Sequence, residues 1–128
     1  MQKLTLLLLL IIFFSCKLTT DCSKYHKGTF LYKSRDYFDT LLIERNDSME
    51  TTIHMKKGFV TKYRLVWKSP CDYDRYLVSS TDTSESVAYT RNHQIHISIL
   101  RGWNDYYLFR VTLDEDKIGF VDTVYLAK

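Results

Sequence analysis

From Gly28 onward the chain is a succession of short alternating segments separated by turn residues, and this pattern restricts its fold more than any other feature. In the segment 60–68, Tyr63, Leu65 and Trp67 fall on one face of an extended chain, and charged residues fall on the other. Such alternation is typical of a strand that packs on one side and meets water on the other. Because apolar stripes of helical period are absent, the sequence predicts an all-β domain.

Turn signals divide this domain into about eight strands. We expect strands at 28–34, 37–45, 49–57, 60–68, 72–80, 93–100, 106–113 and 117–126, and a weaker one at 87–91 that could merely lead into the strand at 93–100. Short turns between successive strands favour antiparallel neighbours. An antiparallel meander of this size hides its edges by closing. We therefore expect a small up-and-down barrel or half-barrel, with a β-sandwich as the alternative.

The start of the chain reads as an export signal. Residues 4–14 form an apolar stretch too short for a transmembrane helix, which needs about 20 residues, but suited to a secretory signal. The small residue Ser15 before Cys16 resembles a bacterial lipobox, in which the cysteine takes a diacylglyceryl group and becomes the mature N-terminus. The alternative is an ordinary signal peptide with an incidental cysteine. Phe13 argues against it, because ordinary cleavage sites prefer small residues at two positions.

This interpretation sets the domain organisation and the compartment. We expect a lipoprotein signal peptide at 1–15, a lipid-anchored tether at 16–27 and a single β domain at 28–128. The membrane is then a partner through the acyl chains on Cys16, since each buried CH₂ contributes about 0.8 kcal/mol. Lys17 is not the aspartate that retains enterobacterial lipoproteins in the inner membrane. We therefore expect an outer-membrane lipoprotein of the cell envelope, with periplasmic and surface-facing orientations both open.

The remaining cysteines indicate a covalent bond. If Cys16 carries lipid, Cys22 and Cys71 are the two that remain of three. Two cysteines in an exported chain suggest a disulfide, and the alternative is a pair of free buried thiols. No C-x-x-C pair occurs, and His93 and His96, three positions apart, would point to opposite faces of a strand. We expect no metal site and no cofactor.

Several short motifs in the first half of the domain carry a family resemblance. Cys22, Gly28-Thr29-Phe30, Ile43-Glu44-Arg45 and the run 67–73 form a series that resembles small lipoproteins of Bacteroidetes-type bacteria, over residues 22–80. The resemblance implies that the two non-lipidated cysteines occur together. Some members carry the label DNA topoisomerase IV, which a short exported chain does not support. The first motif also resembles the start of lipocalin-like barrels, where a Gly-x-Phe opens the first strand.

Charge and motif content exclude several functions. The formal net charge is only +3 and no basic run or stripe occurs, so nucleic-acid binding has no electrostatic basis. No G-x-S-x-G elbow and no glycine-rich phosphate loop is present. Without a catalytic constellation, we expect that the protein is not an enzyme.

Aromatic residues are the most suggestive remaining feature, with ten Tyr, seven Phe and two Trp in the chain. Aromatics commonly fill small β cores, and the alternative is a ligand pocket lined by rings and hydroxyls. The candidates for such a pocket are Tyr63, Trp67, Tyr73, Tyr107 and Phe109.

Two turn residues are candidates for surface roles. Trp103 lies in the turn 102–105, where it could contact a partner. Ser48, in the triplet Asp47-Ser48-Met49, resembles the O-glycosylation triplet of Bacteroidetes envelope proteins. We expect a non-catalytic binding or protein-interaction module whose partner is another envelope protein, with a lipocalin-like carrier of a small apolar or amphipathic ligand as the alternative. An open cavity would favour the carrier, and a filled interior the interaction module.

Overall fold

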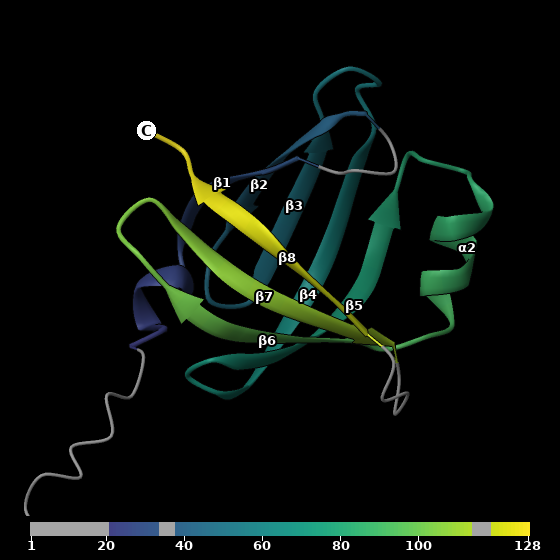
Figure 1. The fold of residues 1–128 in the computed structure, drawn as a ribbon. Helices are drawn as coiled ribbons and strands as arrows, with labels where there is room; N and C mark the ends of the chain where they lie inside the picture. The colour runs from purple at the N-terminus through teal and green to yellow at the C-terminus, as the bar shows by residue number, and fades with distance from the viewer. Residues whose placement is uncertain (1–20, 34–37, 114–118) are drawn as a thin grey trace, which may run out of the picture.

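Eight antiparallel strands form a closed barrel in which each strand pairs with the next along the chain and β8 returns to β1 (Figure 1). The structure, a computed structural model, describes residues 21–33, 38–113 and 119–128. Its elements are η1 (Ser23–Tyr25), β1 (Gly28–Lys33), β2 (Thr40–Arg45), β3 (Met49–His54), β4 (Val60–Ser69), β5 (Asp72–Ser80), α2 (Glu85–Arg91), β6 (Ile95–Gly102), β7 (Tyr106–Leu113) and β8 (Gly119–Leu126). The predicted all-β barrel is confirmed, and the sandwich alternative is wrong.

One predicted element has the wrong type. The segment 87–91, a weak strand candidate, belongs to the helix α2 instead. Val87 and Tyr89 favour strands, but β-propensity is mainly a preference for packing on a sheet surface. No residue of α2 is buried, so Val87 and Tyr89 do not pack on a sheet surface that would favour a strand here. The helix begins directly after Ser84, a residue type favoured at helix N-caps, which was the available sequence signal.

The inward faces of the strands match the predicted alternation. On β4, Tyr63 and Leu65 are buried, whereas Lys62 and Arg64 between them are exposed. On β6, the isoleucines at 95, 97 and 99 are all buried. Antiparallel pairing brings these residues to the barrel interior, where they form one core with the inward residues of β7 and β8.

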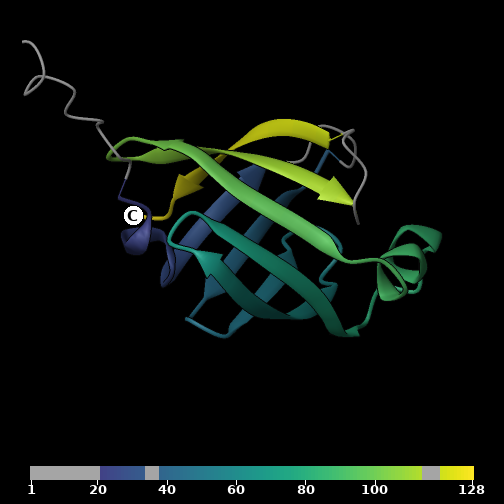
Figure 2. The ribbon, with the colours of Figure 1, turned by 90° about the horizontal axis from the view of Figure 1, so that it is seen from below.

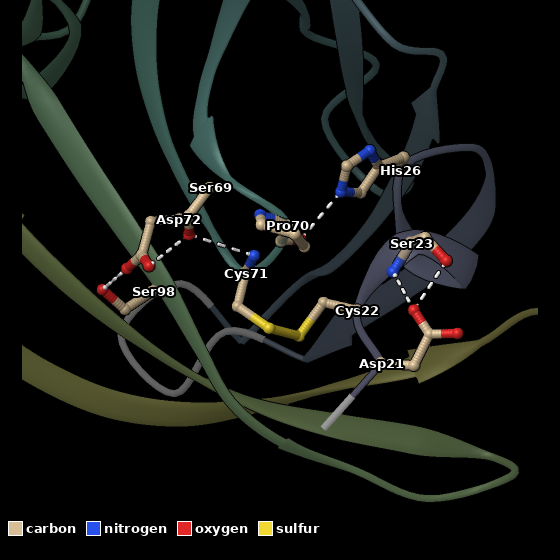
Figure 3. The surroundings of a disulfide bond; sticks show 9 residues. All are labelled: Asp21, Cys22, Ser23, His26, Ser69, Pro70, Cys71, Asp72 and Ser98. Carbon is tan, nitrogen blue, oxygen red and sulfur yellow. Dashed lines mark hydrogen bonds between the residues drawn. A yellow bond between two sulfur atoms is a disulfide. The ribbon is translucent and has the colours of Figure 1, made fainter. Parts of the chain in front are cut away.

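A disulfide bond between Cys22 and Cys71 fastens the N-terminal segment to the turn between β4 and β5 (Figure 3). Its sulfur atoms are 1.97 Å apart and the two cysteines are separated by 49 positions. The side chain of Asp21 accepts hydrogen bonds from the backbone N–H and the hydroxyl of Ser23, at 3.0 and 2.7 Å, at the start of η1 (Figure 3). The predicted disulfide is therefore present. Residues that the sequence placed in the tether belong to the packed fold, since Cys22 and Tyr25 are fully buried.

Tyr25 closes this end of the barrel. Its ring lies 4.6 Å from that of Tyr107, and its hydroxyl donates to the carbonyl oxygen of Trp103 at 3.1 Å. Its own carbonyl oxygen accepts from Arg45, which projects from β2 into the interior. Tyr25 thus acts as a plug at this end of the barrel, held by ring packing and by hydrogen bonds through its hydroxyl and its carbonyl oxygen.

The opposite end of the barrel carries α2 (Figures 1 and 2). Strands β5 and β6 pair only between Asp72–Arg75 and Ile95–Ser98, so the second half of β5 continues without β6 beside it. The chain crosses this space through α2. Within the described parts of the chain, no helix is long and apolar enough to cross a membrane.

Candidate functional site

The barrel interior contains a cavity of about 500 Å³. Inward side chains of the strands form its wall, and residues of α2 and of the loop before it line its outer end. Aromatic and aliphatic side chains make up most of the wall, among them Tyr63, Tyr73, Ile95, Ile97, Tyr107 and Phe109. The volume is within the range of about 300–1,000 Å³ that is usual for small-molecule sites.

Four of the five predicted pocket residues line this cavity, and Trp67 does not. Trp67 lies on the inward face of β4, but near the strand's end and beneath η1. Its ring stacks on His26 with centroids 3.5 Å apart and lies 4.5 Å from the ring of Tyr73. His26 in turn donates from Nε2 to the carbonyl oxygen of Pro70 at 2.8 Å (Figure 3). Trp67 therefore supports the closed end and not the cavity wall.

A buried ionic network forms the deep part of the cavity. Glu50, from β3, accepts from Nε of Arg45 at 2.8 Å through one oxygen and from Nη1 of Arg75 at 3.0 Å through the other. Arg45 also donates to the hydroxyl of Tyr107 at 3.1 Å. The side chains of Glu50 and Arg45 are 1% and 2% exposed. Both oxygens of the carboxylate are therefore occupied by guanidinium groups inside an apolar barrel.

Burial and charge act in opposite directions on these groups. Burial disfavours the ionised form of Glu50, but the positive charges and hydrogen bonds of Arg45 and Arg75 outweigh it, so the pKa of Glu50 is lowered. Burial also opposes the charge of Arg75, but Tyr63 and Glu50 outweigh it and its pKa is raised. Burial raises the pKa of Tyr73 and of the Tyr107 hydroxyl. The network is therefore ionised at neutral pH, with neutral tyrosines around it.

Arg75 uses only part of its hydrogen-bonding capacity. It donates to Glu50 from Nη1, whereas its Nε is buried and has no acceptor among the described residues. The guanidinium lies over the ring of Tyr63, 4.2 Å from the centroid. Its side chain is 20% exposed, and it lines the cavity. A cationic group with unused donors thus faces the interior space.

Sequence reasoning missed this network, although the strand pattern contained a signal for it. Arg45 follows the core residue Ile43 by two positions, and Arg75 follows Tyr73 by two, so each falls on the apolar face of its strand. Charged residues at core-facing positions are uncommon unless they are paired. Two arginines and an acid at such positions indicate a buried polar site, but the contact of Arg75 on β5 with Glu50 on β3 passes over β4, and the order of neighbouring strands does not predict it.

A buried acidic group, Asp39, lies beside His54 of the cavity lining without lining the cavity itself. Oδ1 of Asp39 accepts from the backbone N–H groups of Thr40 and Lys56 at 2.7 and 3.0 Å, which ties the segment before β2 to the turn after β3. Burial opposes its charge, but these hydrogen bonds and nearby His54 lower the pKa of Asp39. His54, whose Nδ1 is 3.6 Å from Asp39, lines the cavity.

A second polar cluster lies on the outer face of β5 and β6. His96 Nδ1 is 2.8 Å from Asp74. The Ser98 hydroxyl donates to Asp72 at 2.6 Å, as Figure 3 shows. Ser98 Oγ is also 3.4 Å from His96 Nε2. Asp72 and His96 are partly exposed on the outside of the barrel, and neither lines the cavity. The cluster links the two strands where their backbone pairing is short, which is a structural role.

The other predicted site residues lie away from the cavity. Trp103, in the turn between β6 and β7 at the closed end, is half-buried and stacks on Tyr106 with centroids 4.6 Å apart. Ser48, in the turn between β2 and β3, is exposed, and its backbone N–H donates a hydrogen bond to Oδ1 of Asn46. Cys16 lies outside the described residues.

Among the residues that the structure describes, no group of three or more His, Cys, Asp or Glu side chains is placed to hold a metal ion.

Comparison with protein-family models, with curated proteins and with solved structures found no match.

Proposed function

We propose that the protein is a lipid-anchored binding protein of the cell envelope whose barrel holds one small, largely apolar molecule. The observation that carries this proposal is the cavity of about 500 Å³ inside a closed barrel. Small β-barrels usually fill their interior with side chains, so a cavity of this volume that side chains leave open supports a binding role for the interior. A concave, mostly apolar wall with a few polar groups at one end is the usual composition of a small-molecule site.

The arrangement of the two barrel ends supports a single route of access. Tyr25 and the disulfide-linked N-terminal segment occupy one end, and the cavity extends to the loop and helix α2 at the other. Phe120 and Tyr89, which are both exposed, lie where the cavity reaches the surface. A ligand therefore enters beside α2 and moves inward toward Glu50 and Arg75.

The lipid anchor, if it is on Cys16, directs this mouth away from the bilayer. Cys16 precedes Cys22 by six positions, which an extended chain spans in about 20 Å. Because Cys22 is fixed at the closed end, the short tether brings that end to the membrane surface. The ligand is then exchanged with the compartment and not directly with the anchoring bilayer. The outer membrane remains the proposed location, with no nucleic acid as partner.

Native mass spectrometry of the protein, gently extracted from its own membranes, tests the whole proposal. The covalent mass reports acylation, and loss of a hydrogen pair reports the disulfide. A non-covalent adduct of small-molecule mass is the expected result for a carrier. A bare protein without adduct, or one that is co-extracted with another protein instead, would contradict the carrier function and favour the interaction module. A mature mass without lipid would contradict the anchor.

A further inference from the structure

We infer that the ligand carries a single anionic group, a carboxylate, on its apolar body and that Arg75 binds this group inside the barrel. The inference rests on the proposed function, because it assigns chemistry to the ligand of the same cavity. It depends on the charge balance deep in the barrel and on the geometry of Arg75.

The deep part of the cavity contains more positive than negative charge. Arg45 and Arg75 are both ionised, and Glu50 is the acid that lies between them. Among the residues that the structure describes, the other acid that lines the cavity is Asp82, in the loop at the mouth, where it accepts from the backbone N–H of Ser84 at 2.9 Å. Within the described ranges, one positive charge deep in the cavity is therefore left without a counter-charge in an apolar interior, which is costly unless an anion joins it.

Geometry identifies Arg75 as the residue with capacity for that anion. Arg45 donates to Glu50, to the carbonyl oxygen of Tyr25 and to Tyr107, so each of its three nitrogens has an acceptor. Arg75 donates to Glu50 through Nη1 alone, and its Nε has no acceptor in the described regions. The Arg75 side chain lines the cavity and is 20% exposed, so its guanidinium is reached from the cavity although Nε itself is buried. A planar carboxylate is the natural partner of a guanidinium edge, because it accepts two parallel hydrogen bonds.

The remaining wall defines the rest of the ligand. Beyond Arg75 the cavity is lined toward the mouth by aliphatic and aromatic groups such as Leu113 and Phe109. An amphipathic acid with its carboxylate on Arg75 would place its apolar chain along this wall. A cationic amphiphile would instead bring a second positive charge to Arg75, and a neutral one would leave the guanidinium edge without a partner.

Calorimetric titration of the full chain in a neutral detergent with decanoate, decanol and decylamine at pH 7 tests the inference. Variants Arg75→Met and Arg64→Met are compared with the unchanged protein. Arg64 is a matched control, because it lies on the outer face of β4 over Tyr76, at 4.5 Å from the ring centroid. Partitioning into detergent differs between the compounds but is the same for every variant, so it cancels when the preference for decanoate over decanol is compared between variants.

We expect decanoate to bind about tenfold more tightly than decanol, which is the effect of one charge-assisted contact after desolvation, and decylamine to bind most weakly. In Arg75→Met the preference for decanoate over decanol should fall to about one, and in Arg64→Met it should be unchanged. Arg75→Lys, which keeps the charge without the planar edge, should retain part of the preference.

Two other results are informative in different ways. If decanol and decanoate bind equally well and Arg75→Met changes neither, the carboxylate inference is overturned while the proposed binding function stands. If none of the three compounds binds the unchanged protein, the binding function is overturned and the inference falls with it. Melting temperatures of both methionine variants well above the titration temperature show that a lost preference does not come from unfolding.

Discussion

The ring of Tyr25 lies directly against the backbone of Gly102, so that a Cβ atom at position 102 would overlap the tyrosine hydroxyl and the ring carbons beside it. Tyr25 is fully buried and donates to the carbonyl oxygen of the next residue, Trp103, at 3.1 Å. The glycine at the end of β6 is therefore a steric requirement of the plug that closes the barrel.

Gly102→Ala should destabilise the protein by about 1–3 kcal/mol, because a methyl group inserted into a packed contact must displace the aromatic ring. Urea unfolding followed by fluorescence measures the change. Asn104→Ala, an exposed position in the same turn, is the control and should change the unfolding free energy by less than about 0.5 kcal/mol. Equal stability of Gly102→Ala and the unchanged protein would show that Tyr25 can move aside without cost.

Removal of the disulfide should both destabilise the barrel and loosen its closed end. The Cys22–Cys71 bond closes a loop of 49 positions, for which chain entropy gives about 4 kcal/mol. We expect Cys22→Ala with Cys71→Ala to lower the urea midpoint and to increase hydrogen exchange at Tyr25 and His26. Reducing agent should lower the midpoint of the unchanged protein and leave that of the double variant as it is. An equal drop in the urea midpoint of both proteins would show that the reductant acts on something other than the Cys22–Cys71 bond.

The regular part of this fold could be predicted from the sequence, because strand alternation has a period of two residues along the chain and needs no knowledge of distant contacts. On this basis the alternation predicts Tyr63 and Leu65 inward and the charged residues between them outward, as the structure has them. The short helix at Glu85–Arg91 could not be recognised in the same way, since it has no buried face and thus no periodic stripe.

The candidate site could be predicted only in part. Its aromatic wall was anticipated, because rings at inward positions are visible in the alternation. The ionic network was not, since the contact of Arg75 with Glu50 joins strands β5 and β3, which are separated by β4 in the sheet and meet only through side chains that point into the interior. The existence of a cavity likewise depends on how side chains fill a closed barrel, which is a property of three-dimensional packing.

Acid should destabilise the barrel through Glu50. Its pKa is lowered in the folded state by Arg45 and Arg75 against the effect of burial, so the folded protein binds fewer protons there than the unfolded chain. The stabilisation is complete above the ordinary glutamate pKa of about 4.3 and is lost as pH falls through the lowered folded value. Urea unfolding at a series of pH values should show a plateau near neutrality and a decline below about pH 4.

Arg75→Met provides a direct test of this assignment. Loss of one of the two guanidinium groups raises the folded pKa of Glu50 toward its unfolded value, so the decline in stability should still begin near the ordinary glutamate pKa but end at a higher pH and be smaller in total. Asp39 and Asp72, whose pKa values are also lowered, retain their own contribution in this variant. An unchanged pH profile would show that those acids, and not Glu50, dominate acid unfolding.

Two threonines on neighbouring strands should respond oppositely to the same substitution. Thr52 on β3 and Thr61 on β4 are paired in register, line the cavity and are both buried. Thr52 Oγ1 has no hydrogen-bond partner among the residues that the structure describes, whereas Thr61 Oγ1 is 2.7 Å from Ser80 Oγ. Thr52→Val removes an unsatisfied buried hydroxyl at nearly constant shape and should stabilise the protein by about 1 kcal/mol.

Thr61→Val breaks an existing hydrogen bond and should destabilise the protein by about 1 kcal/mol. Chemical unfolding of the two variants, prepared side by side, measures the difference of about 2 kcal/mol between them. Because the two residues face each other across one strand pair, the added apolar surface and any change in strand propensity are closely matched. A destabilising effect of Thr52→Val equal to that of Thr61→Val would show that the Thr52 hydroxyl has a partner within the cavity, such as an ordered water molecule or the ligand itself.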